Sequence, residues 1–335
     1  MARSSGASER VLEVAGLRTH FFVAGGVVKA VDGVDLTIER DEIVTIVGES
    51  GSGKSVTALS VMGLITPPGR IVGGSVRHLG TELTRLSPRR MQAIRGRTIT
   101  MVFQNPYTSL HPVMTIGRQM TESIMLSQGV DRAQARRRAI ELLEHIGVEG
   151  APQVLQRYPF EVSAGVSQRA MLAMALAPRP ALLIADEPTT NLDSLSQIQF
   201  LRLVRQMRDE MHMSVLLITH DFGVVSMMSD KVVVMYAGRE IEKGSAAQVL
   251  RAPSHPYSAA LLNSVRVLSA AAEVKRLEQI PGEVPDVMRL PPGCSFRPRC
   301  ARAMPACRAD PPTVALPGGQ QVRCWLHADA ERRAS

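Results

Sequence analysis

A glycine-rich loop over residues 48–55, Gly-Glu-Ser-Gly-Ser-Gly-Lys-Ser, is the feature that most constrains this chain. The apolar, β-branched run 43–47 before it predicts a buried strand, and the apolar run 56–65 after it predicts a helix. A strand, a tight turn and a helix N-terminus together form a pocket of backbone N–H groups that suits a polyphosphate. The sequence therefore predicts a site for a nucleoside triphosphate at this loop.

The residue types in the loop match that purpose. Gly48 and Gly53 permit the tight backbone, and Lys54 reaches the terminal phosphates. The Ser55 hydroxyl is suited to bind Mg²⁺. The rest of the predicted phosphate cradle consists of Glu49, Ser50, Gly51 and Ser52.

The bulk composition is that of an ordinary globular protein, with 45% hydrophobic and 21% charged residues. The length of 335 residues fits one large domain with an appendage. No run approaches the ~18 uninterrupted apolar residues that a membrane span needs. Residues 1–10 lack the apolar core of a secretory signal. We therefore expect the chain to stay in the cytosol, with partners providing any docking on a membrane.

The net charge of +8 and the pI near 9.8 raise the question of a nucleic-acid partner. Much of the charge is dispersed or lies on one predicted helix, 131–145, which also carries an apolar face. Only 4% of residues are aromatic, which argues against a base-stacking platform. We expect a solvated basic face, suited to the neighbourhood of anionic lipid headgroups, and no nucleic acid.

The order of predicted elements indicates an α/β layered core. Strands alternate with helices, and a helix-rich stretch between about 110 and 160 suggests an inserted helical subdomain. After about residue 251 prolines recur, which indicates a less regular C-terminal module. The strands expected after the loop are 98–103, 181–185, 214–219 and 231–236.

Two acids end the predicted strand 181–185. Asp186 is expected to hold Mg²⁺, and Glu187 to accept a proton from attacking water. An Asp-Glu-Pro turn that merely ends a strand is the alternative, which the phosphate loop makes much weaker. Gln104 follows its own strand and can touch Mg²⁺ or the water, and His220 can contact the γ-phosphate. For either residue alone, a structural role is the favoured alternative.

Taken in order, these motifs resemble those of ABC-transporter ATP-binding subunits, over residues 11 to about 327. The resemblance makes 48–55 the Walker A loop and Asp186 and Glu187 the end of the Walker B strand. It makes Gln104 the Q-loop glutamine, Asp193 of Asn-Leu-Asp the D-loop residue and His220 the switch histidine.

The resemblance is strongest to the peptide- and nickel-importer branch, the dipeptide and oligopeptide permease ATPases. It rests on residues 47–55, 103–106 and 235–239, on His-Pro-Tyr at 255–257 and on the cysteine-rich end, 294–324. The family also implies an aromatic side chain that stacks on adenine. Phe21 matches this position best and Phe22 is the alternative, although core packing explains either aromatic equally well.

The resemblance implies a P-loop NTPase fold of the ABC type, an α/β fold with an antiparallel β subdomain and a helical subdomain. The nucleotide-binding domain would span 10–250, with the helical subdomain at about 107–178. A flexible tail would occupy 1–9, and a Cys-rich C-terminal extension would occupy 251–335.

The implied activity is ATP hydrolysis that powers import of peptides. The implied partners are a second ATPase subunit, two transmembrane permease subunits and, indirectly, an extracytoplasmic solute-binding protein. The chain would then lie at the cytoplasmic face of the membrane. The alternatives are an ABC ATPase that acts on nucleic acid or ribosomes, and a regulatory subunit with little turnover.

One motif departs from the family pattern. The signature loop, normally Leu/Phe-Ser-Gly-Gly, reads Val162-Ser163-Ala164-Gly165. Ser163 and Gly165 are retained, so they are expected to cap the γ-phosphate bound by the opposite subunit. Ala164 adds a methyl group where the backbone is expected to need the freedom of glycine. We hypothesise a heterodimer with two unequal ATP sites.

The four cysteines, Cys294, Cys300, Cys307 and Cys324, all lie in the last 42 residues. Random placement gives such clustering only about 2 times in 10,000, so it needs a cause. Disulfides are disfavoured in the cytosol, and the spacing has no Cys-x-x-Cys pair of the kind typical of zinc sites. An iron–sulfur cluster, zinc and free thiols remain open from the residues alone. The family resemblance implies a structural [4Fe–4S] cluster.

Overall fold

The computed structural model describes residues 9–269, 280–283 and 285–328, which fall into two compact units. The helical unit contains the described residues 9–11, 38–42 and 85–218, and the β-rich unit contains 12–37, 43–84 and the described residues from 219 onward. The expected tail, 1–9, lies outside the described residues except for its last residue.

An antiparallel sheet forms the first part of the β-rich unit. It contains β1 (Arg10–Val23), β2 (Gly26–Glu39), β4 (Gly69–His78) and β5 (Thr81–Glu82) in the order β2-β1-β4-β5. Along β2 the apolar side chains of Val34, Leu36 and Ile38 are buried, while the residues between them are not. This period of two is what places one face of a strand on a core. The sheet confirms the expected antiparallel β part of the fold.

The same unit carries the strand that leads into the phosphate loop. All five residues of β3 (Ile43–Val47) are buried, as the β-branched run predicts, and β3 pairs in parallel with β9 (Lys231–Tyr236). Helix α1 (Lys54–Val61) begins inside the loop, two residues earlier than expected, and also ends earlier. It ends early because Gly63, with φ of 60°, turns the chain out of the helix.

The C-terminal residues extend the strands of the β-rich unit. β10 (Arg239–Ser245) pairs with β9 and with β12 (Gln321–Arg323), which in turn pairs with β11 (Thr313–Ala315), all antiparallel. The buried carboxylate of Glu242 accepts hydrogen bonds from Ser254 N (2.6 Å), His255 N (3.0 Å) and Gln320 Nε2 (2.6 Å). Glu242 thus fastens the last strands and the segment before α11 to β10.

Short helices complete this unit. They are α9 (Phe222–Met228), α10 (Ala246–Arg251) and α11 (Pro256–Ser269), followed by the 3₁₀ turns η2 (Arg297–Arg299), η3 (Pro305–Arg308) and η4 (Pro317–Gly319). The rings of Tyr236, Tyr257 and Phe296 pack together, with centroids 4.7 to 5.3 Å apart. This aromatic cluster joins β9, α11 and the cysteine-bearing segment in one core.

The helical unit contains three parallel strands in the order β6-β7-β8: β6 (Ile99–Val102), β7 (Leu182–Asp186) and β8 (Ser214–Thr219). Its helices are α2 (Pro88–Gln92), α3 (Pro106–Ser109), α4 (Ile116–Gln128), α5 (Arg132–His145), α6 (Ala151–Val154), α7 (Ala164–Leu176) and α8 (Ser194–Met211), with a 3₁₀ turn, η1 (Pro159–Glu161).

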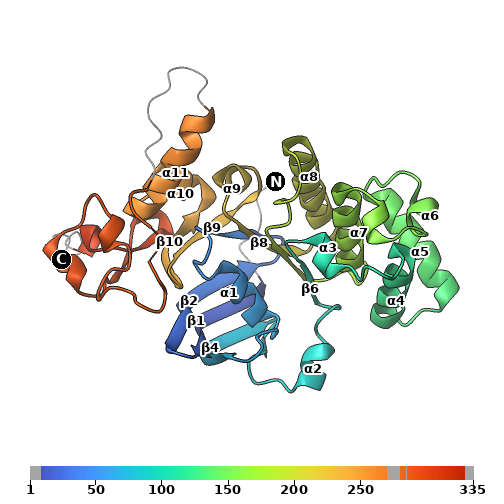
Figure 1. The fold of residues 1–335 in the computed structure, drawn as a ribbon, viewed down its shortest axis with the longest axis horizontal. Helices are drawn as coiled ribbons and strands as arrows, with labels where there is room; N and C mark the ends of the chain where they lie inside the picture. The colour runs from blue at the N-terminus through green and yellow to red at the C-terminus, as the bar shows by residue number, and fades with distance from the viewer. Residues whose placement is uncertain (1–8, 270–279, 284, 329–335) are drawn as a thin grey trace. The chain divides into compact units, whose positions relative to one another are not determined.

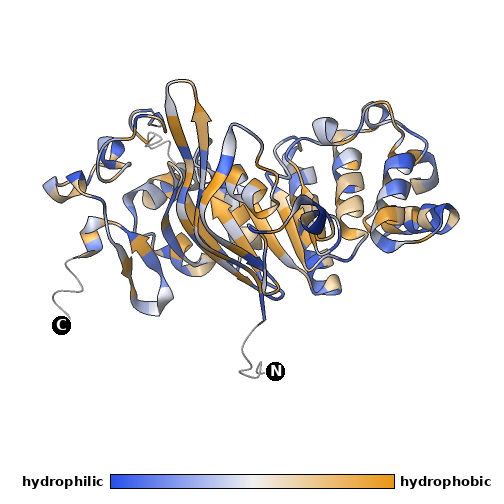
Figure 2. Ribbon diagram, turned by 90° about the horizontal axis from the view of Figure 1, so that it is seen from below, coloured by the Kyte–Doolittle hydropathy of each residue, from blue (hydrophilic) through white to orange (hydrophobic). Residues whose placement is uncertain are grey.

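Helices α4, α5 and α7 pack against one another, as Figure 1 shows in green tones. In α5 the buried side chains of Ala135, Ala139 and Leu143 form the apolar face, and its arginines at 132 and 136–138 are exposed. Figure 2 shows hydrophobic residues concentrated in the strands, whereas these helices alternate hydrophobic and hydrophilic colours. Such amphipathic helices bury one stripe and leave the other in solvent.

Candidate nucleotide site

The phosphate loop of the β-rich unit is shaped by close contacts between backbone segments. A Cβ atom added to Gly48 would lie 2.2 Å from Met235 O, and one added to Gly53 would lie 2.2 Å from Ala30 O. Gly53 also has φ of 102°, a left-handed conformation that other residues rarely adopt. Only glycine fits either position, so the loop is held against the backbone of β2 and β9.

The Lys54 side chain folds back over this loop. It is 5% exposed, and its Nζ donates hydrogen bonds to Gly48 O (2.8 Å) and Glu49 O (2.9 Å). The Ser52 hydroxyl is buried and has no hydrogen-bond partner among the described residues. A buried ammonium and an unsatisfied hydroxyl in a turn at a helix N-terminus fit a bound polyphosphate.

Glu49, expected as part of the phosphate cradle, forms hydrogen bonds with residues outside the loop. Its backbone N–H donates to the hydroxyl of Tyr257 (2.8 Å), and its carboxylate accepts two hydrogen bonds from Arg299. The sequence analysis missed Tyr257 and Arg299. Both lie in segments that stood out there, His-Pro-Tyr at 255–257 and the cysteine-rich end.

The expected acids lie at the end of β7 in the helical unit. Asp186 is 7% exposed, and Glu187 directly follows it with φ of 43°. A positive φ at a residue with a Cβ stores strain that is typical of functional sites. The Glu187 N–H donates to Ile218 O (2.9 Å), which helps to hold this conformation.

Gln104 and Glu187 come together, as their places after neighbouring strands suggest. Gln104 Nε2 donates to Glu187 Oε2 (3.1 Å), and Thr190 Oγ1 donates to the same oxygen (3.1 Å). Asn191 Nδ2 donates to Gln104 O (3.3 Å), which ties the two loops together. Two side-chain donors therefore fix the orientation of the Glu187 carboxylate.

The signature and D-loop residues begin two helices of this unit. Ser163 caps α7 by accepting a hydrogen bond from Val166 N (3.3 Å), and its side chain is exposed. Ala164 is the first residue of α7 and has ordinary helical backbone, so the expectation that this position needs glycine is wrong for the conformation seen here. A Cβ added to Gly165 would meet no described atom within 4 Å.

Asp193 caps α8. Its Oδ1 accepts from Leu195 N and Ser196 N, each at 3.0 Å. The hydrogen bond from the Ser196 hydroxyl, together with these backbone donors, lowers the pKa of Asp193. In this structure the Asp193 carboxylate therefore acts as the N-terminal cap of α8.

Phe21, Phe22 and His220 belong to the β-rich unit. Phe21 is half-buried and lies so close to Gly69 that an added Cβ there would be 2.5 Å from its ring. Phe22 is exposed, and the Arg70 guanidinium lies 4.1 Å from its ring centroid. His220 is exposed just after β8 and before α9, whose cap is Asp221.

The four cysteines line one pocket together with His255, Phe296 and Trp325. Burial raises the pKa of the Cys294, Cys300 and Cys324 thiols, that of Cys324 to about 11. In the described parts of the chain, no group of three or more His, Cys, Asp or Glu residues is placed to hold a metal ion. The thiols therefore gather in one place but not at ligand spacing.

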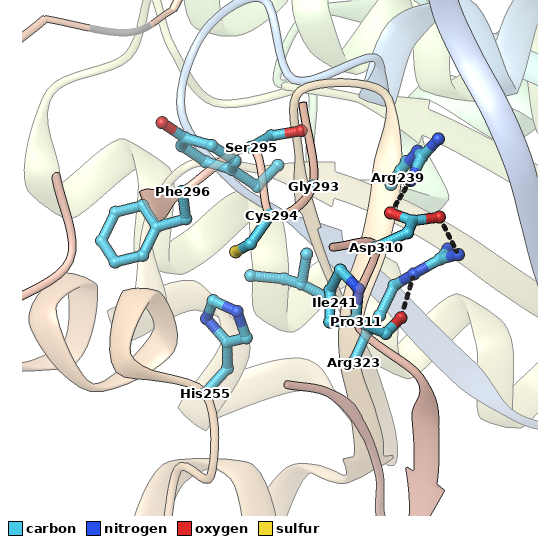
Figure 3. Close-up of a pocket in the computed structure, with 11 residues that line it drawn as sticks. Arg239, Ile241, His255, Gly293, Cys294, Ser295, Phe296, Asp310, Pro311 and Arg323 are labelled. Carbon is cyan, nitrogen blue, oxygen red and sulfur yellow. Dashed lines mark hydrogen bonds and ion pairs between the residues drawn. The ribbon is translucent and has the colours of Figure 1, made fainter. Parts of the chain in front are cut away.

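An adjoining pocket shares Cys294, His255 and Phe296 and is drawn in Figure 3. The Cys294 sulfur points into it, near the two rings. On its other side Asp310 forms ion pairs with Arg239 (2.7 Å) and Arg323 (3.5 Å). These pairs connect the cysteine-bearing segment to β10 and β12.

Comparison with known proteins decides the family. The family model "ABC transporter" matches residues 31–190, and "Oligopeptide/dipeptide transporter, C-terminal region" matches 241–307. The chain is 44% identical to the oligopeptide transport ATP-binding protein AppD of Bacillus subtilis over 95% of this chain and 97% of AppD. It belongs to the ATP-binding subunits of oligopeptide and dipeptide ABC transporters.

Two further relatives agree with this placement. OppD, the oligopeptide transport ATP-binding protein of Salmonella typhimurium, is 45% identical over 94% of this chain and 93% of its own. DppD, the dipeptide transport ATP-binding protein of Escherichia coli, is 42% identical over 95% and 97%. As a member of this family, the chain is an ABC-type ATPase.

The fold also matches solved structures. A dimeric structure of the ATP-binding cassette MJ0796, bound to ADP and Pi, has a TM-score of 0.64 at 24% identity and covers 70% of this chain and 98% of that one. The cbiO1 structure from Clostridium perfringens gives a TM-score of 0.60, also at 24% identity, over 72% and 90%. These matches confirm the ATP-binding cassette fold. Among the described helices, none has the length and apolar character needed to cross a membrane.

Proposed function

We propose that this subunit hydrolyses ATP to energise the import of oligopeptides or dipeptides through a membrane transporter. The observation that carries the proposal is the pair of family models on one chain, a transporter ATPase followed by the oligopeptide/dipeptide C-terminal region. The peptide-transport names of AppD, OppD and DppD support the same class of solute. We retain 10–250 as the nucleotide-binding domain, with a helical subdomain at about 107–178, and 251–335 as the extension.

The proposed reaction is attack of water on the γ-phosphorus of ATP. The bond from this phosphorus to the oxygen of the leaving ADP breaks, and Glu187 takes the proton of the water. Lys54 and the backbone N–H groups of the loop 48–55, other than that of Glu49, bind the phosphates, and His220 contacts the γ-phosphate. Phe21 stacks on adenine. Ser163 and Gly165 of the signature loop cap the γ-phosphate bound by the opposite subunit, and Asp193 is the D-loop residue at the same interface between subunits.

Three residues are proposed to hold Mg²⁺: Ser55, Gln104 and Asp186. Their hydroxyl, amide and carboxylate oxygens are the hard ligands that Mg²⁺ prefers. When bound, the ion neutralises charge on the β- and γ-phosphates. Gln104 already contacts Glu187, so the amide links the metal site to the proton acceptor.

Replacing Glu187 by Gln tests its role as proton acceptor. The amide keeps the shape and the contact with Gln104 but cannot take a proton, so turnover should fall by at least ~100-fold while ATP still binds. Equilibrium ATP binding and phosphate release in the assembled transporter measure the two effects. Lys54→Ala should abolish binding itself, and Glu144→Gln, an exposed change on α5, is the matched control. Normal turnover in the Glu187→Gln protein would remove Glu187 from this role.

We further propose that the subunit pairs with a second, different ATPase subunit and docks on two transmembrane permease subunits at the cytoplasmic face. An extracytoplasmic solute-binding protein would deliver the peptide to the permeases. The exposed position of Ser163 at the start of α7 supports its use by a nucleotide on the opposite chain. Because the Ala164 backbone is already helical, its methyl group would act by crowding that nucleotide and not by backbone strain.

Exchanging Ala164 for Gly separates crowding from strain. Loss of the methyl should raise the ATPase rate or the ATP affinity of the assembled complex several-fold. The same change should lower thermal stability slightly, since glycine is less favourable than alanine in a helix by up to ~1 kcal/mol. Steady-state ATPase kinetics and thermal unfolding follow the two effects. Unchanged rate and affinity would show that Ala164 does not impair the site.

We also propose that Cys294, Cys300, Cys307 and Cys324 bind a [4Fe–4S] cluster, with zinc as the alternative. Their common pocket supports a shared ligand, and two of the four, Cys307 and Cys324, are buried in it. When bound, either group would cross-link the segments that carry the four thiolates. The proposed role is structural.

Anaerobic purification tests the occupant of the cysteine pocket. A cluster should give a brown protein that absorbs at about 400 nm, with about four iron and four sulfide per chain. It should also quench Trp325, the one tryptophan, which adjoins Cys324. Cys294→Ser should lose the colour. A colourless protein with bright tryptophan emission would contradict the cluster, and bound zinc would establish the alternative.

A further inference from the structure

Glu49 in the phosphate loop is held at three points. Its carboxylate accepts from Arg299 in a bidentate pair, Nη1 to Oε2 at 2.7 Å and Nη2 to Oε1 at 3.1 Å. Its N–H donates to the Tyr257 hydroxyl at 2.8 Å, and its carbonyl accepts from Lys54 Nζ at 2.9 Å. One residue thus connects the phosphate-binding lysine to two residues that lie more than 200 positions away.

Arg299 is placed by its own surroundings. Its side chain is 6% exposed, and its Nε donates to Pro281 O (3.1 Å). Nη1 also lies 3.4 Å from the Tyr236 hydroxyl. The hydrogen bonds to Glu49 raise the pKa of the guanidinium further, so it stays charged. A buried charge of this kind needs its partner, because removing one member leaves the other uncompensated.

Tyr257 is fully buried in the ring cluster with Tyr236 and Phe296, so its hydroxyl has little freedom to move. Because this hydroxyl takes the Glu49 N–H, that amide is not directed at the phosphates. The contact instead fixes the backbone direction at the first turn of the loop.

We propose that Arg299 and Tyr257 are positioning residues that hold the phosphate loop through Glu49 and thereby set its affinity for nucleotide. The C-terminal module would then be part of the binding site without touching the ligand. Since Arg299 directly precedes Cys300, loosening of the cysteine-bearing segment would reach the loop through the same contact. This inference rests on the proposed nucleotide role of Lys54 and the loop 48–55, and not on the heterodimer or the cluster.

The test is equilibrium binding of ATP to the full chain, with Arg299→Met, Glu49→Gln and the double variant, at a temperature where all are folded. Arg299→Met should weaken ATP binding at least about 10-fold, because the loop loses its anchor and the half-buried Glu49 carboxylate loses its ion pair. The double variant should bind no more weakly than the worse single variant, since both changes remove one interaction. A merely structural role would lower the unfolding temperature and leave the affinity of the folded protein unchanged.

Arg308→Met is the matched control, because Arg308 is an exposed arginine of the same module, and it should bind ATP normally. Tyr257→Phe removes only the hydroxyl and should weaken binding several-fold, so it decides the question if Arg299→Met does not fold. Unchanged affinity in folded Arg299→Met or Tyr257→Phe, or strictly additive losses in the double variant, would overturn the inference. Normal binding by Lys54→Ala would instead overturn the nucleotide role itself.

Discussion

The phosphate loop depends on contacts between its own backbone and distant parts of the chain. Glycines at 48 and 53 let the loop press against Met235 O and Ala30 O, and any larger residue would collide there. Lys54 closes over the loop by hydrogen bonds to two of its carbonyls. Contacts within the chain therefore set the shape of the loop, and a loop held in this way loses less entropy on binding.

The C-terminal module shares in this construction. Strand β12 pairs with β10, and β11 pairs with β12, so both strands extend the sheet. The buried carboxylate of Glu242 accepts three hydrogen bonds from segments that follow β10. The aromatic cluster of Tyr236, Tyr257 and Phe296 packs the same module against β9. From this module Arg299 donates a hydrogen bond to the Glu49 carboxylate in the loop. In the helical unit, Glu187 is aimed in a comparable way, by Gln104 and Thr190.

Local sequence patterns predicted the parts of the site that depend on local structure. The β-branched run 43–47 and the glycine spacing defined the loop. The contact between Gln104 and Glu187 was seen only in the structure, where their two strands are neighbours. Nothing local predicted the partners of Glu49, which lie 208 and 250 residues away and meet it only through tertiary packing. The departure from the signature motif suggested that position 164 needs the backbone freedom of glycine. In the structure Ala164 is the first residue of helix α7, a conformation that alanine adopts readily. Clustering of the cysteines along the chain indicated a common cause for their placement, and the structure brings all four to one pocket. Distances between thiols depend on side-chain placement that sequence spacing does not determine.

Amide hydrogen exchange in the nucleotide-free, full-length protein tests most directly whether the loop is held in advance. The account predicts that the Glu49 N–H, bonded to the buried Tyr257 hydroxyl, exchanges at least ~100-fold more slowly than an unstructured amide. Exchange of the Glu49 amide at the rate of an unstructured peptide would contradict it, since the loop would then take shape only when nucleotide binds.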